Sequence, residues 1–183
     1  SIFLASTITS ALATLAPSKI KVTKTCLLNS NLFTQHGILE TIVSQINETR
    51  FTWFNSILSN NIGPRPYNSA SNTQAAEFIA EELNATQSIS ASYQWFTYAG
   101  NTIANVIGTL PSANPNNQSK IVVGAHFDTV SNSPGADDDG SGTALLLEVA
   151  KVLSQFKFNC AIEFVAFNAE EVGQIGSNYY VQR

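Results

Sequence analysis

Three residues of types that bind metal ions or activate water lie within residues 122–181: His126, Asp138 and Glu171. His126 follows a short apolar run, Asp138 lies in the glycine-bounded turn PGADDDGSG, and Glu171 follows a second apolar run. One imidazole with hard oxygen ligands suits zinc, and manganese or cobalt would also be accepted. Three such residues from separate elements describe a metal site better than a packed core.

His126 has a neighbour of the right type two residues along the chain. A carboxylate that holds the distal imidazole N–H is the usual companion of a metal-bound histidine, and Asp128 could supply it. Taken alone, His126 could equally be a core histidine that is hydrogen-bonded to a neighbour. The surrounding motif, rather than the residue itself, favours the metal interpretation.

Acidic residues crowd the expected site, at positions 137–139 and 170–171. The alternative interpretation is a helix N-cap in a solvated acidic loop, together with a solvated pair at a strand end. Packing these carboxylates together is costly without a cation, which favours a divalent metal. Beside a metal, adjacent carboxylates can divide the work, since one can ligate while the other takes a proton from bound water and passes it to a leaving amine.

The elements around these residues predict how they are brought together. The apolar runs 121–126 and 161–167 are typical of strands buried on both faces, and 142–153 has a helical pattern. This order predicts a parallel strand–helix–strand crossover. Ligands bind at the carboxyl ends of strands in open α/β sheets, so the candidate residues should converge there. The predicted fold is α/β, with a mixed, mostly parallel sheet flanked by helices.

The rest of the chain supplies further elements of this fold. Helical spacing is present over 38–58, with a break near Asn47, and over 73–83, with Ser71 or Asn72 as the cap. Alternating or apolar patterns predict strands over 88–98 and 102–110, and another helix begins at 176. The polar stretch SANPNNQS is expected to be the tip of a hairpin.

Composition limits the class of protein. A chain of 183 residues with 44% apolar residues can form one domain with a sizeable core. The net charge of −4, with no basic cluster, gives no indication of a nucleic-acid partner. Charged residues make up only 12%, about half the usual share, and asparagine and serine supply the missing polarity.

Several features favour a secreted or vacuolar/lysosomal glycoprotein. Glycosylation sequons begin at Asn47, Asn84 and Asn117. Residues 1–16 contain an apolar run and an Ala-Leu-Ala triplet, so residues 1–30 are interpreted as a leader or signal-like segment and 31–183 as catalytic domain. No other membrane span is expected. Cys26 and Cys160 could form a disulfide, although Cys160 could equally be a buried free thiol.

In combination and order, these motifs resemble the di-zinc exopeptidases of the leucyl-type aminopeptidase family, which also holds glutamate carboxypeptidases and glutaminyl cyclases. The resemblance spans about residues 54–183. Its specific parts are GAHFD, PGADDDGSG and NAEEVGQIGS. Its supporting parts are IGPRP, AAEFIAEEL and NVIGTLP. The resemblance implies a three-layer sandwich, a peptide substrate and two zinc ions.

The resemblance also implies a role for each matching residue. His126 binds one zinc, Glu171 binds the other, and Asp138 bridges both. Glu170 is the general base, and Asp128 orients His126. The peptide bond that follows Asp138 is implied to be cis, a costly form outside proline that persists at over-determined sites.

This sequence departs from the family pattern in one respect. The family needs two further ligands downstream, an aspartate and a histidine, and neither residue type follows Glu171. His36, the only other histidine, lies in the N-terminal region and is a poor substitute. We therefore expect the chain to be an N-terminal piece of a longer enzyme, with a sheet that is incomplete at the C-terminus.

Three functions are consistent with the sequence. The first is a zinc aminopeptidase, in which water deprotonated by Glu170 attacks a peptide carbonyl. The second is a carboxypeptidase or glutaminyl cyclase of the same fold, because the fold does not determine the substrate. The third is a binding homologue without catalysis, which the retained candidate residues argue against.

Overall fold

The computed structural model describes Cys26 and residues 35–182. The leader expected over residues 1–30 lies outside the described residues, apart from Cys26, and stays a prediction. Among the described residues, none of the helices is both long and apolar enough to cross a membrane.

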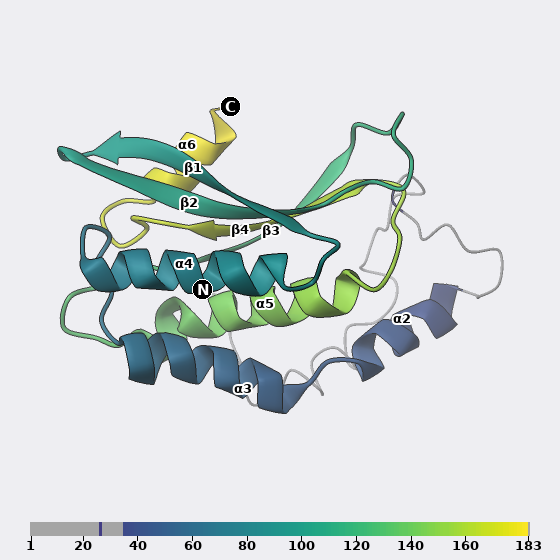
Figure 1. Ribbon diagram of the computed structural model, residues 1–183, viewed down its shortest axis with the longest axis horizontal. Coiled ribbons are helices and arrows are strands. Elements are labelled where there is room, and N and C mark those ends of the chain that lie inside the picture. Colours follow the sequence, from purple (N-terminus) through teal and green to yellow (C-terminus); the bar gives the residue numbers. More distant parts are fainter. Residues whose placement is uncertain (1–25, 27–34, 183) are drawn as a thin grey trace.

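A four-stranded sheet forms the centre of the molecule, in the order β1-β2-β4-β3. Its strands are β1 (Ser90–Tyr98), β2 (Asn101–Leu110), β3 (Lys120–His126) and β4 (Ala161–Phe167). The mixed sheet is confirmed (Figure 1). Within the described residues β3 and β4 pair in parallel and the other two pairings are antiparallel, so the parallel part is smaller than expected.

The hairpin expected at residues 112–119 is wrong. The strands that this segment joins do not pair, because β4 lies between them and pairs with both. The backbone N–H of Ala161, the first residue of β4, instead donates to the carbonyl oxygen of Ser119 at 3.2 Å. Polarity and turn residues predicted a loop correctly but could not show which strands it separates.

Helices lie on both faces of the sheet. On one face lie α4 (Ala70–Asn84) and α5 (Gly142–Leu153), and α3 (Glu48–Ser56) packs beyond them (Figure 1). The short helix α6 (Ile175–Val181) lies on the other face. The remaining elements are α2 (Gln35–Ser44), the π-helical turn η3 (Ile57–Ile62) and the irregular turn η4 (Ala136–Ser141). The flanking helices that were expected are thus present.

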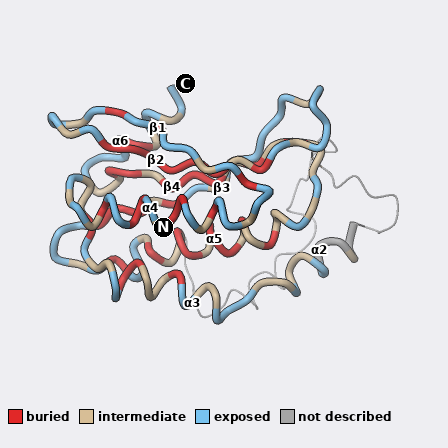
Figure 2. Tube along the Cα trace, in the orientation of Figure 1, coloured by how far each residue is buried: buried red, intermediate tan, exposed pale blue. Residues whose placement is uncertain are grey.

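The core lies between the sheet and the first helical layer. Buried residues gather along β2, β4, α4 and α5 (Figure 2). Its largest fully buried apolar side chains are Phe54, Leu58, Ile79, Leu83, Val106, Phe127, Leu146, Leu147, Val152 and Phe164. The apolar face predicted for residues 73–83 is confirmed, whereas the helix begins earlier, with Ser69 rather than Ser71 or Asn72 as its cap.

Strand β3 is less buried than its sequence predicted. Ile121 and Val122 are each 44% exposed. Within the described residues β3 has one neighbouring strand, β4, so its other edge is free. The continuous apolar run of β3 predicted burial on both faces, and this prediction is wrong for the first half of the strand.

One link ties Cys26 of the N-terminal region to the start of β4, and another ties two helices to each other. Cys26 and Cys160 form a disulfide, which settles the alternative left open by the sequence. Fully buried Glu148 of α5 accepts hydrogen bonds from Arg50 Nε at 2.6 Å, Arg50 Nη2 at 2.7 Å and the Asn47 backbone N–H at 2.7 Å. Asn47 also caps α3, which confirms the helix break expected there.

This buried carboxylate yields a stability prediction. Arg50→Ala should lower the free energy of unfolding by about 3 kcal/mol, the low end of the range for a broken buried pair, because Arg50 is 32% exposed. The apolar double variant Arg50→Met/Glu148→Leu should recover most of that loss. Urea unfolding measures both, with the exposed Thr52→Ala on the same helix as the control. A double variant no more stable than Arg50→Ala would contradict the assignment of the loss to an unpaired buried charge.

Candidate metal centre

The candidate residues meet at the carboxyl ends of the two parallel strands. His126 is the last residue of β3, and Glu170 and Glu171 follow the end of β4. Asp138 lies in η4, immediately before α5. His126 Nε2 lies 3.0 Å from Asp138 Oδ1 and 3.8 Å from Glu170 Oε2. The convergence predicted from the strand order is therefore present in the structure.

Asp128 connects the two strand ends. Its buried carboxylate accepts the backbone N–H of Glu170 on Oδ1 at 3.0 Å and that of Glu171 on Oδ2 at 3.2 Å. The same Oδ1 lies 3.6 Å from His126 Nδ1, whereas the backbone oxygen of Asp128 is closer, at 3.2 Å. Asp128 thus faces the distal imidazole nitrogen, as expected, and in addition holds the backbone of the glutamate pair.

Asp139 uses both of its carboxylate oxygens to hold the backbone around the site. Its Oδ1 accepts the Gly142 N–H at 2.9 Å at the start of α5, and its Oδ2 accepts the His126 N–H at 3.3 Å. Thr143 Oγ1 donates to the His126 carbonyl at 2.8 Å from the first turn of the same helix. One of the three aspartates therefore has the helix-end role proposed from the sequence, and Asp138, with a 79% exposed side chain, is left free to bind a ligand.

The electrostatic field at this position favours a cation. Burial alone would lower the pKa of His126, but contact with the Asp128 carboxylate and the charges of Asp128, Asp139 and Glu170 raise it to about 9. Burial raises the pKa of Glu171, and the charge of Asp138 adds to this effect, while His126 opposes it. Carboxylates that raise one another's pKa and hold a proton on a neighbouring imidazole would also attract a metal ion.

A buried arginine, which the sequence analysis did not single out, holds the loops of the site together. Arg65 is fully buried and donates to the carbonyl oxygen of Phe127 at 2.5 Å, of Pro134 at 2.7 Å and of Gly135 at 3.1 Å. It also donates to the carbonyl oxygens of Leu58 and Gly63. These contacts place one guanidinium between the loop after β3 and the turn that carries Asp138.

The chemical context of Arg65 is unusual for its residue type. Burial lowers its pKa to about 10, although the charges of Asp128 and Asp139 act in the opposite direction. The sequence contained one indication, because the motif IGPRP belongs to the resemblance, but an arginine in a proline-rich loop is usually exposed.

An amide network supports the other side of the site. Asn168, two residues before Glu170, exchanges hydrogen bonds with Asn72 of α4 at 2.9 and 3.1 Å. Its backbone N–H donates to Asn105 Oδ1 of β2 at 2.9 Å. All three asparagines are buried. They fix the path of the chain between the end of β4 and the glutamate pair. No sequence pattern indicated this role for any of them.

His126 and Asp138 fit zinc in type and in spacing. Ligand atoms about 2.0–2.1 Å from a tetrahedral zinc lie about 3.3 Å from one another, and His126 Nε2 lies 3.0 Å from Asp138 Oδ1. In the part of the chain that the structure describes, no group of three His, Cys, Asp or Glu side chains is arranged to hold an ion by itself. Catalytic zinc normally has three protein ligands, so the described residues provide part of a site.

The structure brings His126, Asp128, Asp138, Glu170 and Glu171 to one edge of the sheet, as expected. The peptide bond between Asp138 and Asp139 is cis, as the resemblance implied. Which of the acids ligate a metal is not tested by these contacts and stays a prediction.

Comparison with known proteins agrees with this geometry. Residues 105–183 match the model for peptidase family M28. Aminopeptidase YwaD of Bacillus subtilis is 41% identical over 96 residues, which cover 52% of this chain and 21% of that protein. Among solved structures, LapB from Legionella pneumophila has a TM-score of 0.72 and 29% identity over 92% of this chain and 48% of its own.

A second solved structure shares the fold at lower identity. BSAP, a zinc aminopeptidase from Bacillus subtilis, has a TM-score of 0.70 and 19% identity over 75% of this chain and 65% of its own. The part of YwaD that aligns is thus about a fifth of its length, and the chain spans less than two thirds of each of these proteins. The resemblance to the zinc exopeptidases is confirmed, and residues 105–183, which match the peptidase family M28 model, carry every candidate site residue.

Proposed function

We propose that this protein is a zinc-dependent aminopeptidase, which hydrolyses the N-terminal peptide bond of a peptide substrate. The observation that supports this most strongly is that His126 Nε2, at the end of β3, lies 3.0 Å from Asp138 Oδ1 and 3.8 Å from Glu170 Oε2. These residues lie inside the segment that matches peptidase family M28. The Bacillus subtilis relatives named above carry aminopeptidase names.

The residues of the site divide into ligands and a base. In this proposal His126, Asp138 and Glu171 hold zinc, with Asp138 shared between two ions as the resemblance implies. Zinc bound there would act as a Lewis acid toward the substrate carbonyl and lower the pKa of bound water. Glu170 would serve as the general base, which takes a proton from the attacking water and passes it to the leaving amine. Asp128 fixes the backbone of both glutamates, so the base and the ligand keep their relative positions.

The alternatives are less well supported. A carboxypeptidase or a glutaminyl cyclase would use the same fold, and a binding homologue would need neither base nor metal. The retained ligand types and the negative field at His126 argue against a homologue that has lost its metal.

We also propose an oxidising, secretory or vacuolar/lysosomal location. The disulfide between Cys26 and Cys160 supports it, because such bonds persist mainly in those compartments. The sequons support it in part. Asn84 is exposed at the C-terminal end of α4, whereas Asn47 uses its side chain to cap α3.

The function is tested first by activity and metal removal. The full-length protein should release 4-nitroaniline from leucyl-4-nitroanilide, lose this activity on dialysis against a chelator and regain it with zinc. Formation of pyroglutamate from a glutaminyl peptide, without release from the leucyl substrate, would identify a glutaminyl cyclase instead. Release from an N-blocked peptide at its C-terminus would identify a carboxypeptidase.

The second prediction separates the two glutamates. In the full-length protein, Glu170→Gln should keep its zinc and lose about 100-fold or more in kcat, the range for removal of a general base. Glu171→Gln is the matched variant and should lose zinc, as measured by metal analysis after gel filtration. Zinc loss in Glu170→Gln with normal zinc in Glu171→Gln would reverse the two assignments.

The third prediction concerns Asp128. Asp128→Asn replaces one acceptor oxygen by an N–H donor, so one of the two backbone hydrogen bonds to the glutamate pair is lost. Zinc affinity, measured by competition with a chromogenic chelator, should fall about 10–100-fold, the usual effect of removing a group that supports a metal ligand. The exposed Asp137→Asn serves as the control with the same loss of charge. Equal losses in both variants would show that only overall charge matters.

A further inference from the structure

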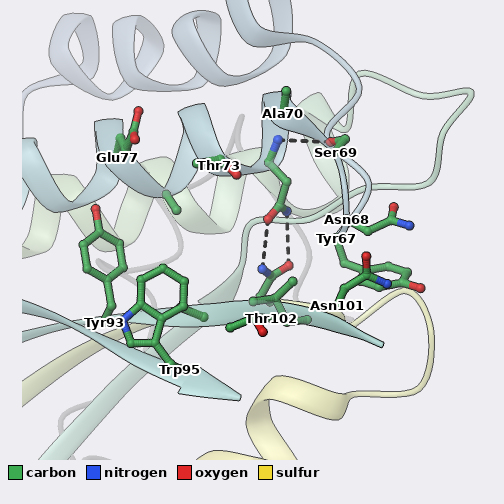
Figure 3. Close-up of a pocket in the computed structure, with 15 residues that line it drawn as sticks. Tyr67, Asn68, Ser69, Ala70, Thr73, Glu77, Tyr93, Trp95, Asn101 and Thr102 are labelled. Carbon is green, nitrogen blue, oxygen red and sulfur yellow. Dashed lines mark hydrogen bonds between the residues drawn. The ribbon is translucent and has the colours of Figure 1, made fainter. Parts of the chain in front are cut away.

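A cavity of about 390 Å³ lies outside the candidate metal centre, between α4 and the hairpin of β1 and β2. Figure 3 shows it bounded by the first half of α4 on one side and by side chains of β1 and β2 on the other. Its volume is within the range of about 300–1,000 Å³ that is typical of small-ligand sites. None of the proposed ligands or the proposed base lines it, although Asn72 and Asn168 of the supporting amide network do.

Aromatic side chains form one wall of the cavity. Tyr93 and Trp95 stand up from β1 toward α4, and their ring centroids are 5.5 Å apart (Figure 3). Trp95 is 59% exposed and Tyr93 is 38% exposed, whereas the side chains between and beside them, Gln94 and Phe96, are buried. Alternation along the strand therefore places two large rings in contact with solvent inside a hollow.

The opposite wall carries negative charge. Glu77 of α4 lines the cavity, and Glu81 lies one turn further along the same helix. Burial raises the pKa of Tyr93, and the charges of Glu77 and Glu81 raise it further, so both carboxylates act on the space beside the ring. Neither glutamate forms an ion pair with a described lysine or arginine, and no described cationic residue lines the cavity.

We propose that this cavity binds an alkyl-ammonium or guanidinium cation, as carried by a lysine or arginine side chain or by a free amine. Aromatic faces attract such cations, and an adjacent carboxylate complements their charge. The remaining polar lining suits their N–H groups, because the side-chain oxygens of Asn68, Thr73 and Thr102 can accept hydrogen bonds. The site neither uses nor requires zinc, so it stands independently of the proposed peptidase activity.

A neutral sugar is the competing occupant, since sugars also stack on exposed aromatic rings beside amide side chains. Glu77 and Glu81 favour the cation, because no described lysine or arginine pairs with them and a neutral ligand would not use their charge. A sugar and a cation therefore differ in their response to salt and to removal of Glu77.

The test uses ¹⁹F NMR of the full-length protein labelled with 5-fluorotryptophan, in which the Trp95 resonance is assigned by its absence from Trp95→Phe. N-acetyl-lysine methylamide and N-acetyl-arginine methylamide should shift this resonance saturably. N-acetyl-norleucine methylamide, which has no charge, should not. Because these compounds are blocked at the amino group, aminopeptidase activity cannot consume them. Butylammonium distinguishes the two sources of the cation. If it binds as tightly as the blocked lysine compound, a free amine suffices. If it binds more weakly, the cavity is specific for a peptide side chain.

Variants of the exposed helix surface provide the controls. Glu77→Gln should weaken binding of the lysine compound about fivefold, the effect of one exposed ion pair, and Glu81→Gln should weaken it less. Glu48→Gln on α3, which does not line the cavity, should leave it unchanged. Added salt should weaken binding. The proposal is overturned if the norleucine compound or methyl glucoside shifts Trp95 equally, if Glu77→Gln binds normally, or if no compound gives a saturable shift.

Discussion

The candidate metal centre depends on a single buried cation, the guanidinium of Arg65. Its donors are shared among backbone carbonyls of the loop after β3, of the turn before Asp138, of Leu58 near the start of η3 and of Gly63 just after its end. A lysine could not replace it, because an ammonium group has three donors at one point whereas the guanidinium presents five in a rigid plane. Gly135 fits the same arrangement, since its φ of +56° turns its carbonyl toward Arg65. Three loops that would otherwise move independently are thus held relative to one another.

This buried positive charge also explains how the site can contain so many acids. Asp128 and Asp139 both act electrostatically on Arg65, and both use their oxygens to accept backbone N–H groups. Their charges are therefore compensated by groups of the protein itself. Asp138 and the two glutamates have no comparable set of donors from the described backbone, apart from a Val130 N–H that serves Glu171. Asp128 and Asp139 therefore build the site, and Asp138, Glu170 and Glu171 are the acids proposed to act on a ligand.

The sequence was sufficient for those parts of the fold in which local pattern and tertiary environment agree. The spans of β4 and α5 were predicted to the residue, because an apolar run and a helical stripe each correspond to burial in one core. The predictions for the loop before β3 and for the exposure of β3 were wrong, because strand pairing is a non-local property that residues 112–126 do not encode. Arg65 was missed for a related reason, since its partners are backbone carbonyls far along the chain, which have no sequence signature.

The parallel pairing of β3 with β4 shows what the topology contributes to the chemistry. This pairing places Phe167 opposite His126 and so brings the carboxyl ends of both strands to the same position. The Phe127 N–H then donates to the Phe167 carbonyl at 3.0 Å, which extends the pairing by one residue into the site. The distance between the candidate ligand and the candidate base is thus set by the register of the β3–β4 pair, whereas their chemical types are set by the sequence.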